Sequence, residues 1–440
     1  MIDSFYMIRI LSIIFLTILT SFYFFPFEFT FLPGVNTKKA MAGVGLILLI
    51  IQLARQKDSI INRDIFQLSI GAGSVSLIGF FAVTWNDTYD YTYATYLVSM
   101  WVWLSGAYVV IQTIKKLHGS VNVELVCNYL IVVSVTQCLI AFAMTQFPPL
   151  KNFVDSFLGS TGFMGKMENR MYGIGASLDV AGSRFSVILV MIVYLLSKIT
   201  PDKKKYIGLY WIIFFVIAVI GNMMSRTTIV GVIIALVYLL YVSRIYTFQM
   251  NLNMQYVWGW FVGILGVSIM LMVYGYHANL AFQENLRFGF EGFFSLVEKG
   301  RWEVHSNDIL KDMYVFPDNL KTWMIGDGYF NGPEDVDPYY IGEKWDVGYY
   351  KGTDVGYLRF IFYFGVTGLI AFSSFIYKTA VVCMRRFKDY RNLFLMVLFL
   401  NFIIWFKVST DLFLVFALFL CLLEENKDSD MKECLENVGQ

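Results

Sequence analysis

Apolar residues in this chain come in blocks about 20 residues long, and this block length constrains the fold more than any other feature. A helix of about 20 apolar residues is long enough to cross the hydrocarbon core of a bilayer. Of the 440 residues, 57% are hydrophobic and only 15% are charged, whereas a soluble domain carries about 25% charged residues. The sequence therefore predicts an all-α polytopic membrane protein in which residues 1–440 form one transmembrane domain.

Twelve apolar stretches are candidate membrane spans. The second is short, and the last two are short enough to form either two spans or one re-entrant pair. The first follows the positive Arg9 as a signal peptide would, but it is long and lacks a small-residue cleavage site, so we expect it to be retained. The candidates are 8–27, 40–54, 65–84, 93–114, 123–147, 177–197, 207–224, 227–243, 256–274, 353–377, 392–407 and 409–423.

Lysine and arginine concentrate in alternate short loops, which orients a membrane protein. With the amino terminus inside, the inner loops hold basic runs at 203–205 and 385–391, and the outer segment 85–92 holds only Asp87 and Asp90. One outer loop disagrees, because it carries Lys38 and Lys39. The balance predicts that both termini are cytoplasmic.

Two long segments, 148–176 and 275–352, are predicted to lie outside the cytoplasm. The first opens with two prolines and is rich in glycine. The second carries thirteen acidic and seven basic residues, for a net charge of −6. Charged residues punctuate its first half at helical spacing, and its second half contains the turn signals Gly326-Asp327-Gly328 and Asn331-Gly332-Pro333. We expect a large, partly helical lid.

Charged residues near the outer ends of the spans are candidates for function, because charge in a membrane is costly. The alternative is structural: Asp179 and Arg184 could pair, as could Asp354 and Arg359, or the arginines could reach to the lipid headgroups. Convergent guanidinium groups would bind a lipid-linked diphosphate bidentately and stay charged at any working pH. The predicted substrate-binding arginines are Arg170, Arg184, Arg226, Arg301 and Arg359.

Two residues at this face could act as an acid or a base. His305 follows Arg301 by four residues, so the two would share one face of a helix, with Trp302 beside them. Histidine titrates near neutral pH, although a lone loop histidine can equally be a solvated residue. Asp354 is the other candidate, but we expect Arg359 to keep it ionised and weakly basic. The prediction is therefore His305 as base and Asp354 as orienting group.

Two motifs in the second long segment have ordinary alternatives. The aromatic and acidic stretch 339–350 suits sugar binding, and equally suits an aromatic belt at the membrane interface. Asp335-Val336-Asp337 has a spacing that can hold a metal, or it can be a solvated acidic surface. The five cysteines show no metal spacing and none lies in the long outer segments. We expect no metal and no other cofactor.

Four stretches within residues 165–370 form a recognisable order. They are Arg170-Met171-Tyr172-Gly173 before 179–182, Ser225-Arg226-Thr227 at the start of a span, Arg301-Trp302 with Gly326-Asp327-Gly328 downstream, and Asp354-Val355-Gly356-Tyr357-Leu358-Arg359 before the glycines at 365 and 368. In these stretches the chain resembles bacterial O-antigen and capsule repeat-unit polymerases and the related O-antigen ligases. Two departures are visible: the family often has Pro-Asn where this chain has Asp179-Val180, and Trp302 follows Arg301 directly where the family has Arg-x-x-x-Trp.

The resemblance implies a membrane glycosyltransferase with a GT-C-like fold in the bacterial cytoplasmic (inner) membrane. It would polymerise undecaprenyl-diphosphate-linked repeat units at the outer face, with the prenyl diphosphate as leaving group and another lipid-linked unit as acceptor. Tyr357 and Trp302 would join the arginines in binding substrate, without nucleotide or metal. A chain-length regulator, a flippase of the same pathway and membrane lipids are the implied partners, and nucleic acid is not expected.

Three alternatives remain open at this point. A ligase of the same family would pass finished polymer to lipid A-core. A flippase or other transporter should place ionisable residues near the bilayer midplane and often shows inverted repeats, whereas here the charges lie at span ends. A purely structural membrane subunit would not need clustered outer arginines.

Overall fold

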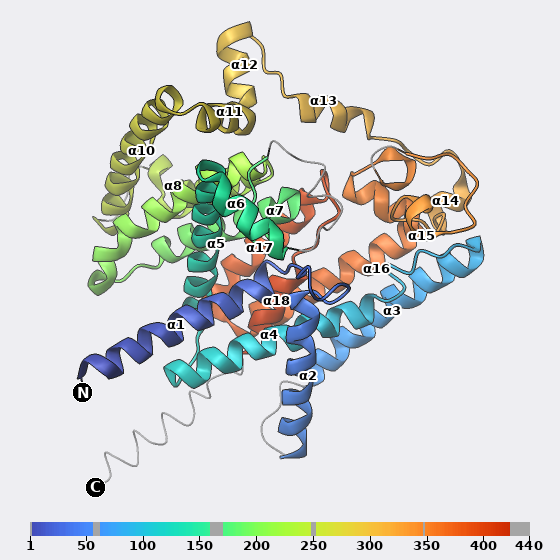
Figure 1. Cartoon of the computed structure of the whole chain (residues 1–440). Helices are drawn as coiled ribbons and strands as arrows, with labels where there is room; N and C mark the ends of the chain where they lie inside the picture. The colour runs from blue at the N-terminus through green and yellow to red at the C-terminus, as the bar shows by residue number, and fades with distance from the viewer. Residues whose placement is uncertain (1, 56–61, 159–169, 248–251, 346–347, 423–440) are drawn as a thin grey trace.

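The computed structural model describes residues 2–55, 62–158, 170–247, 252–345 and 348–422 (Figure 1). In these ranges the regular secondary structure is helical apart from isolated β-bridges, and turns and loops connect the helices. The first ten α-helices are α1 (Ile2–Phe24), α2 (Thr37–Ala54), α3 (Arg63–Asn86), α4 (Tyr96–His118), α5 (Val123–Gln146), α6 (Pro148–Phe157), α7 (Leu178–Ser197), α8 (Ile207–Met224), α9 (Thr228–Ser243) and α10 (Leu252–Ala278). The others are α11 (Leu280–Gly289), α12 (Glu291–Lys299), α13 (His305–Asp312), α14 (Leu320–Met324), α15 (Pro333–Val336), α16 (Gly356–Arg386), α17 (Arg391–Ile404) and α18 (Phe413–Leu420).

Nine helices in the described ranges are long and apolar enough to cross a membrane, so the prediction of a multi-pass α-helical membrane protein is confirmed. They are α1 to α5, α7, α8 with the 3₁₀ turn before it, α10 and α16. The other three predicted spans correspond to shorter helices, α9, α17 and α18, of 16, 14 and 8 residues. At about 1.5 Å per residue, α17 extends only about 21 Å, so twelve full crossings stay a prediction.

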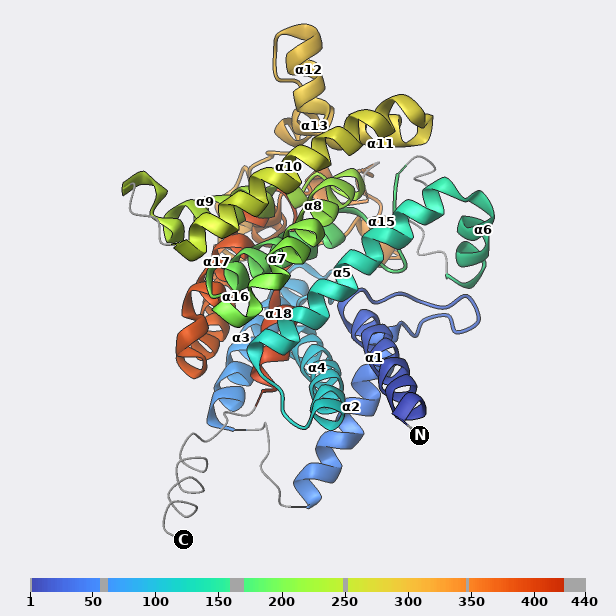
Figure 2. The same ribbon diagram turned by 90° about the vertical axis from the view of Figure 1, so that its left-hand side faces the viewer.

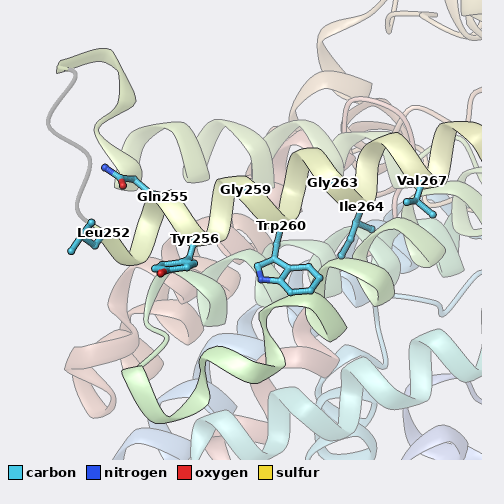
Figure 3. Close-up of a pocket in the computed structure, with 8 residues that line it drawn as sticks. All are labelled: Leu252, Gln255, Tyr256, Gly259, Trp260, Gly263, Ile264 and Val267. Atoms are coloured by element: carbon cyan, nitrogen blue, oxygen red, sulfur yellow. The ribbon is translucent and has the colours of Figure 1, made fainter.

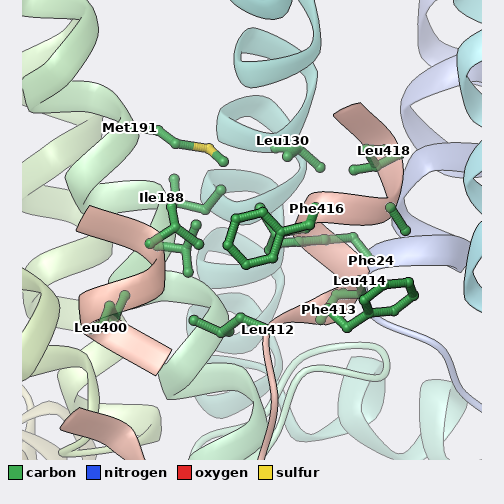
Figure 4. Close-up of a cluster of buried hydrophobic side chains, with 14 of the residues drawn as sticks. Phe24, Leu130, Ile188, Met191, Leu400, Leu412, Phe413, Leu414, Phe416 and Leu418 are labelled. Atoms are coloured by element: carbon green, nitrogen blue, oxygen red, sulfur yellow. The ribbon is translucent and has the colours of Figure 1, made fainter. Parts of the chain in front are cut away.

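Helices α7 and α18 form the centre of the bundle (Figure 2). Helix α18, and α7 after Ser186, are apolar on all sides, as a helix surrounded by other helices must be. Every residue of α18 is buried, and so is almost all of α7. Figure 4 shows side chains of α18 packed with Phe24 of α1, Leu130 of α5 and Ile188 of α7. Gly231 lets α9 approach α7 closely, because a Cβ there would lie 2.2 Å from the Cα of Ser186.

A tight turn at 405–412 separates α17 from α18. The Trp405 indole donates to the Thr410 carbonyl at 3.1 Å, and the Leu412 amide donates to the Asn401 side chain at 2.8 Å. These bonds satisfy backbone groups that the interrupted helix leaves free. The turn brings Lys407 to the end of the bundle where α7 begins.

The long segment 275–352 divides as its sequence pattern predicts. Helices α11, α12 and α13 occupy the first half and project from the bundle, while the second half consists of turns with the short α14 and α15 (Figure 1). Asp90, from the link between α3 and α4, fastens the second half by accepting the Phe330 and Asn331 amides at 2.9 and 2.8 Å. Gly326 fits against α16 only because it lacks a side chain, since a Cβ would lie 2.5 Å from the Tyr363 carbonyl. Of the other long segment, α6 is described, and 159–169 lie outside the described residues.

Candidate functional site

Polar and charged side chains from distant segments meet at one end of the bundle. The segments are the first turn of α7, the break between α8 and α9, the start of α16 and the turn after α17. We call Asp179, Arg226, Asp354, Arg359 and Lys407 the charged cluster. Electrostatic interactions link its members: Asp354 interacts with Asp179, Arg359 and Lys407, and Arg226 interacts with Asp179.

Asp179 is the centre of the cluster. Its carboxylate accepts from the Lys407 ammonium at 3.0 Å and from the Ser225 hydroxyl at 3.0 Å, and also from Thr227. Gly182 allows this approach, because a Cβ there would lie 2.4 Å from the Ser225 hydroxyl oxygen. The alternative that Asp179 pairs with Arg184 is wrong, because Lys407 takes that place.

Arg359 lies between two aromatic rings at the start of α16. Its guanidinium carbon is 3.7 Å from the centroid of Phe330 and 4.1 Å from that of Tyr349. Nη1 contacts an Asp354 carboxylate oxygen at 3.3 Å and Ser409 at 2.9 Å, and Nη2 donates to the Phe330 carbonyl at 3.0 Å. The buried Nε has no hydrogen-bond partner among the described residues. The arginine is thus held in place with one donor left free.

Asp354 precedes α16 and its side chain is only 23% exposed. Burial raises the pKa of Asp354 to about 7; Asp179 acts in the same direction, and Arg359 and Lys407 oppose it. The expectation that Arg359 keeps Asp354 a weak base is therefore wrong, because loss of hydration outweighs one imperfect ion pair. A carboxyl group with a pKa near neutrality suits general-base chemistry.

Arg226, in the break between α8 and α9, joins the cluster to the first half of the long segment 275–352. It pairs with Glu291 at 2.7 Å, donates to Ser306 at 2.7 Å and to the Phe288 carbonyl at 2.9 Å. Arg170 shares the Phe288 ring with it, at 4.9 Å for Arg170 and 4.2 Å for Arg226. Burial lowers the pKa of Arg226, and Glu291 opposes that shift.

The remaining predicted residues of this long segment lie at its surface. Gly300 ends α12 and α13 begins at His305, so Arg301 lies in the link between them. The prediction that Arg301 and His305 share one helical face is therefore wrong. Arg301 is 73% exposed and pairs with Glu303, and Trp302 packs edge-on against Phe293 while 54% exposed. His305 is exposed, but its backbone amide contacts Glu291, the partner of Arg226, at 3.3 Å.

Two predicted substrate residues face away from the cluster. Tyr357 donates its hydroxyl to the Phe402 carbonyl at 3.0 Å and packs against Trp405, so it serves the contact between α16 and α17. Arg184 is buried on another side of α7, where it donates to the Phe24 carbonyl. The structure thus brings Arg170, Arg226 and Arg359 to the cluster and its border, and leaves Arg184, Arg301 and Tyr357 apart.

The acidic motif 335–337 has a structural role. Asp337 is buried and accepts from the Tyr329 hydroxyl at 2.6 Å and from the Tyr339 amide at 2.9 Å. No group of three residues that could hold a metal ion occurs within the described residues. The residues of the nearby aromatic stretch 339–350 have different surroundings: Tyr339 is 78% exposed, whereas Tyr349 stacks on Arg359.

Sequence reasoning missed Lys407 and Glu291. Lys407 had a signal, because it is a charge at the end of a predicted span. No feature of the sequence distinguished Glu291 from the other acidic residues of its segment.

A groove of about 640 Å³ lies elsewhere, along the peripheral helix α10, and is lined by residues such as Tyr256, Trp260 and Ile264 (Figure 3). It is apolar apart from a few groups and is remote in the chain from the cluster. No protein-family model, no curated protein and no solved structure matches the chain.

Proposed function

We propose that the protein is a membrane glycosyltransferase that polymerises undecaprenyl-diphosphate-linked oligosaccharide repeat units into a surface polysaccharide. The observation that carries the proposal is the charged cluster, in which Arg359 and Lys407 act on Asp354, a carboxyl group with a pKa near 7, and Arg226 is linked to it through Asp179. Cations suit the diphosphate of a lipid-linked donor, and a carboxylate of this kind suits deprotonation of a sugar hydroxyl.

In the proposed reaction, Asp354 takes the proton from the acceptor hydroxyl, and the oxygen attacks the anomeric carbon of the donor. The bond from that carbon to the diphosphate oxygen breaks, and the prenyl diphosphate leaves with the bonding electrons. Arg226 and Arg359 would stabilise the negative charge that develops on the leaving group. This assignment moves the base from His305 to Asp354, because Asp354 lies in the cluster and is shielded from water.

The proposal places the chain in the bacterial cytoplasmic membrane, with a GT-C-like fold and both termini cytoplasmic. Residues 275–352 would then lie on the outer face of the membrane, outside the cytoplasm. Ile341 is fully exposed, and the four cysteines among the described residues are buried, so an Ile341→Cys variant in a Cys434→Ser background can be labelled selectively. An impermeant thiol reagent should label it before lysis, and labelling only after lysis would contradict the orientation.

Deleting the gene and examining the surface polysaccharide on a gel tests the activity. Loss of a polymerase leaves a single repeat unit on the final carrier. Loss of a ligase leaves no attached glycan, and loss of a flippase leaves intermediates on the inner leaflet. The ligase is the second candidate, since the same cluster would serve its donor.

In a reconstituted system, the purified chain with synthetic lipid-linked repeat units alone should yield a ladder of polymers. A chain that needs a lipid A-core acceptor is a ligase.

A further inference from the structure

A second group of cations lies at the same end of the bundle, behind α7. Lys38 is in the first turn of α2, and Arg184 is in the second turn of α7. Both flank the end of α1, because Arg184 donates to the Phe24 carbonyl and Thr37, the neighbour of Lys38, donates to the Phe22 carbonyl at 2.9 Å. The two cations also interact electrostatically with each other, and each interacts with Asp411 from the turn before α18. We call Lys38, Arg184 and Asp411 the second cluster.

The cations of the second cluster are poorly neutralised. Arg184 is 5% exposed, its Nη1 donates to a backbone carbonyl, and its buried Nε has no hydrogen-bond partner in the described part of the chain. The Lys38 ammonium lies 4.4 Å from the centroid of Trp103. Among the described residues, neither cation has a carboxylate within the 4 Å of an ion pair, although Asp411 is close enough to attract both. A buried cation left in this state, as Arg184 is, is costly, and an anion would relieve that cost.

Lys38 also departs from the charge distribution of the rest of the chain. With Lys39 it forms the one basic pair in a predicted outer loop. The second cluster thus has an excess of positive charge at a face where the short loops are otherwise poor in lysine and arginine. A recognition role for Lys38 accounts for this exception, because a phosphate group needs the charge there.

The second cluster adjoins the charged cluster without overlapping it. Arg184 follows Asp179 by five residues in α7, which places the two on different faces of that helix. Asp411 follows Ser409, the partner of Arg359, by two residues. Tyr93 interacts electrostatically with both Arg359 and Asp411, so the two clusters are neighbours.

We infer that the second cluster binds the diphosphate of a second lipid-linked substrate. This inference rests on the proposed function, in which donor and acceptor each carry a prenyl diphosphate. The charged cluster holds the diphosphate that leaves, and Lys38 with Arg184 holds the one that stays attached to the growing product. Each glycan then reaches the space near Asp354 from its own side of α7.

The test is the number of prenyl diphosphates bound per chain. The purified full-length protein in nanodiscs of phosphatidylcholine is titrated with undecaprenyl diphosphate, and bound lipid is counted by native mass spectrometry. Wild type should bind two, and Lys38→Gln and Arg226→Gln should each bind one, with affinity at the lost site about tenfold or more weaker. Lys38 is partly exposed, so this variant avoids the folding risk of Arg184→Gln.

Lys39→Gln is the matched control, because Lys39 is the next residue and donates to the Gly34 carbonyl instead; it should still bind two. One bound lipid in wild type, lost in Arg226→Gln and unaffected by Lys38→Gln, overturns the inference and leaves the proposed function standing. No binding in any form refutes the proposed function itself. Displacement of the second lipid by phosphatidylglycerol or by inorganic pyrophosphate at equal concentration would make it a general headgroup or phosphate site, which also overturns the inference.

Discussion

The two halves of the long segment 275–352 handle charge in opposite ways. In the first half, α12, α13 and the link between them carry ion pairs at the surface, such as Arg301 with Glu303 and Lys311 with Asp308. The second half is fastened to the bundle through Asp90, and its aromatic side chains cover Arg359. Water screens the first set of charges, whereas the second set is desolvated.

This difference determines which half can alter the acidity of a side chain. A desolvated carboxyl group changes its proton affinity, as Asp354 does. The first half contributes to the cluster only where it is drawn inward, through Glu291 and Ser306 on Arg226.

The largest expected effect is on Asp354. Asp354→Asn keeps the shape but removes the base, so polymerisation by the purified enzyme should fall by about 10²- to 10⁴-fold. His305→Ala, the matched change in the exposed half, should retain most of the activity and the normal chain lengths. A collapse to single repeats in His305→Ala, with Asp354→Asn active, would reverse the assignment of the base.

Arg359 should be the next most sensitive residue. Lysine in its place cannot span Asp354, Ser409 and the Phe330 carbonyl, so Arg359→Lys should lower the rate by on the order of 10²-fold. Arg301→Lys keeps a charge in the exposed half and should have little effect. The melting temperature of both variants must be measured, because a large loss of stability in Arg359→Lys would assign the arginine to folding alone.

The pH profile gives a smaller effect with a defined sign. Asp354 must be ionised to act as a base, so kcat/KM should rise about tenfold per pH unit below a pKa near 7 and level off above it. Its folded pKa lies above the unfolded value of about 3.9. The folded state therefore binds the additional proton between these values, and the contribution of Asp354 to stability decreases as pH rises from about 4 to 7. A profile that is flat from pH 5.5 to 8 would contradict the role of Asp354.

Much of the fold was predictable, because helix length and hydrophobicity follow directly from residue order. The short α17 and α18 were harder, since the turn at 405–412 depends on tertiary bonds such as that between Asn401 and Leu412. For the site, the position of Arg226 and Arg359 near the ends of predicted spans was enough to single them out. The proton affinity of Asp354 was not predictable, because it depends on burial by residues far away in the chain. The shared face of Arg301 and His305 failed because helical spacing takes no account of the stop at Gly300.

The smallest effect concerns the attachment of the second half to the bundle. Asp90 is 1% exposed and accepts from the backbone amides of Phe330 and Asn331, so Asp90→Asn replaces the carboxylate by a weaker acceptor and points an amide group toward these donors. A change of this kind costs about 1–3 kcal/mol. We expect local loosening rather than global unfolding, because the bundle core does not involve this residue. Limited proteolysis should therefore cut 326–345 faster in Asp90→Asn.

The matched control for this change is Asp308→Asn, which alters an exposed ion pair in the first half. It should leave proteolysis of 326–345 unchanged. Loosening in Asp90→Asn should also lower activity, because Phe330 donates its amide to Asp90 and covers Arg359 with its ring. Faster cleavage without loss of activity would mean that the Phe330 ring stays on Arg359 without the hydrogen bonds to Asp90. The two halves would then differ in burial but not in their contribution to the reaction.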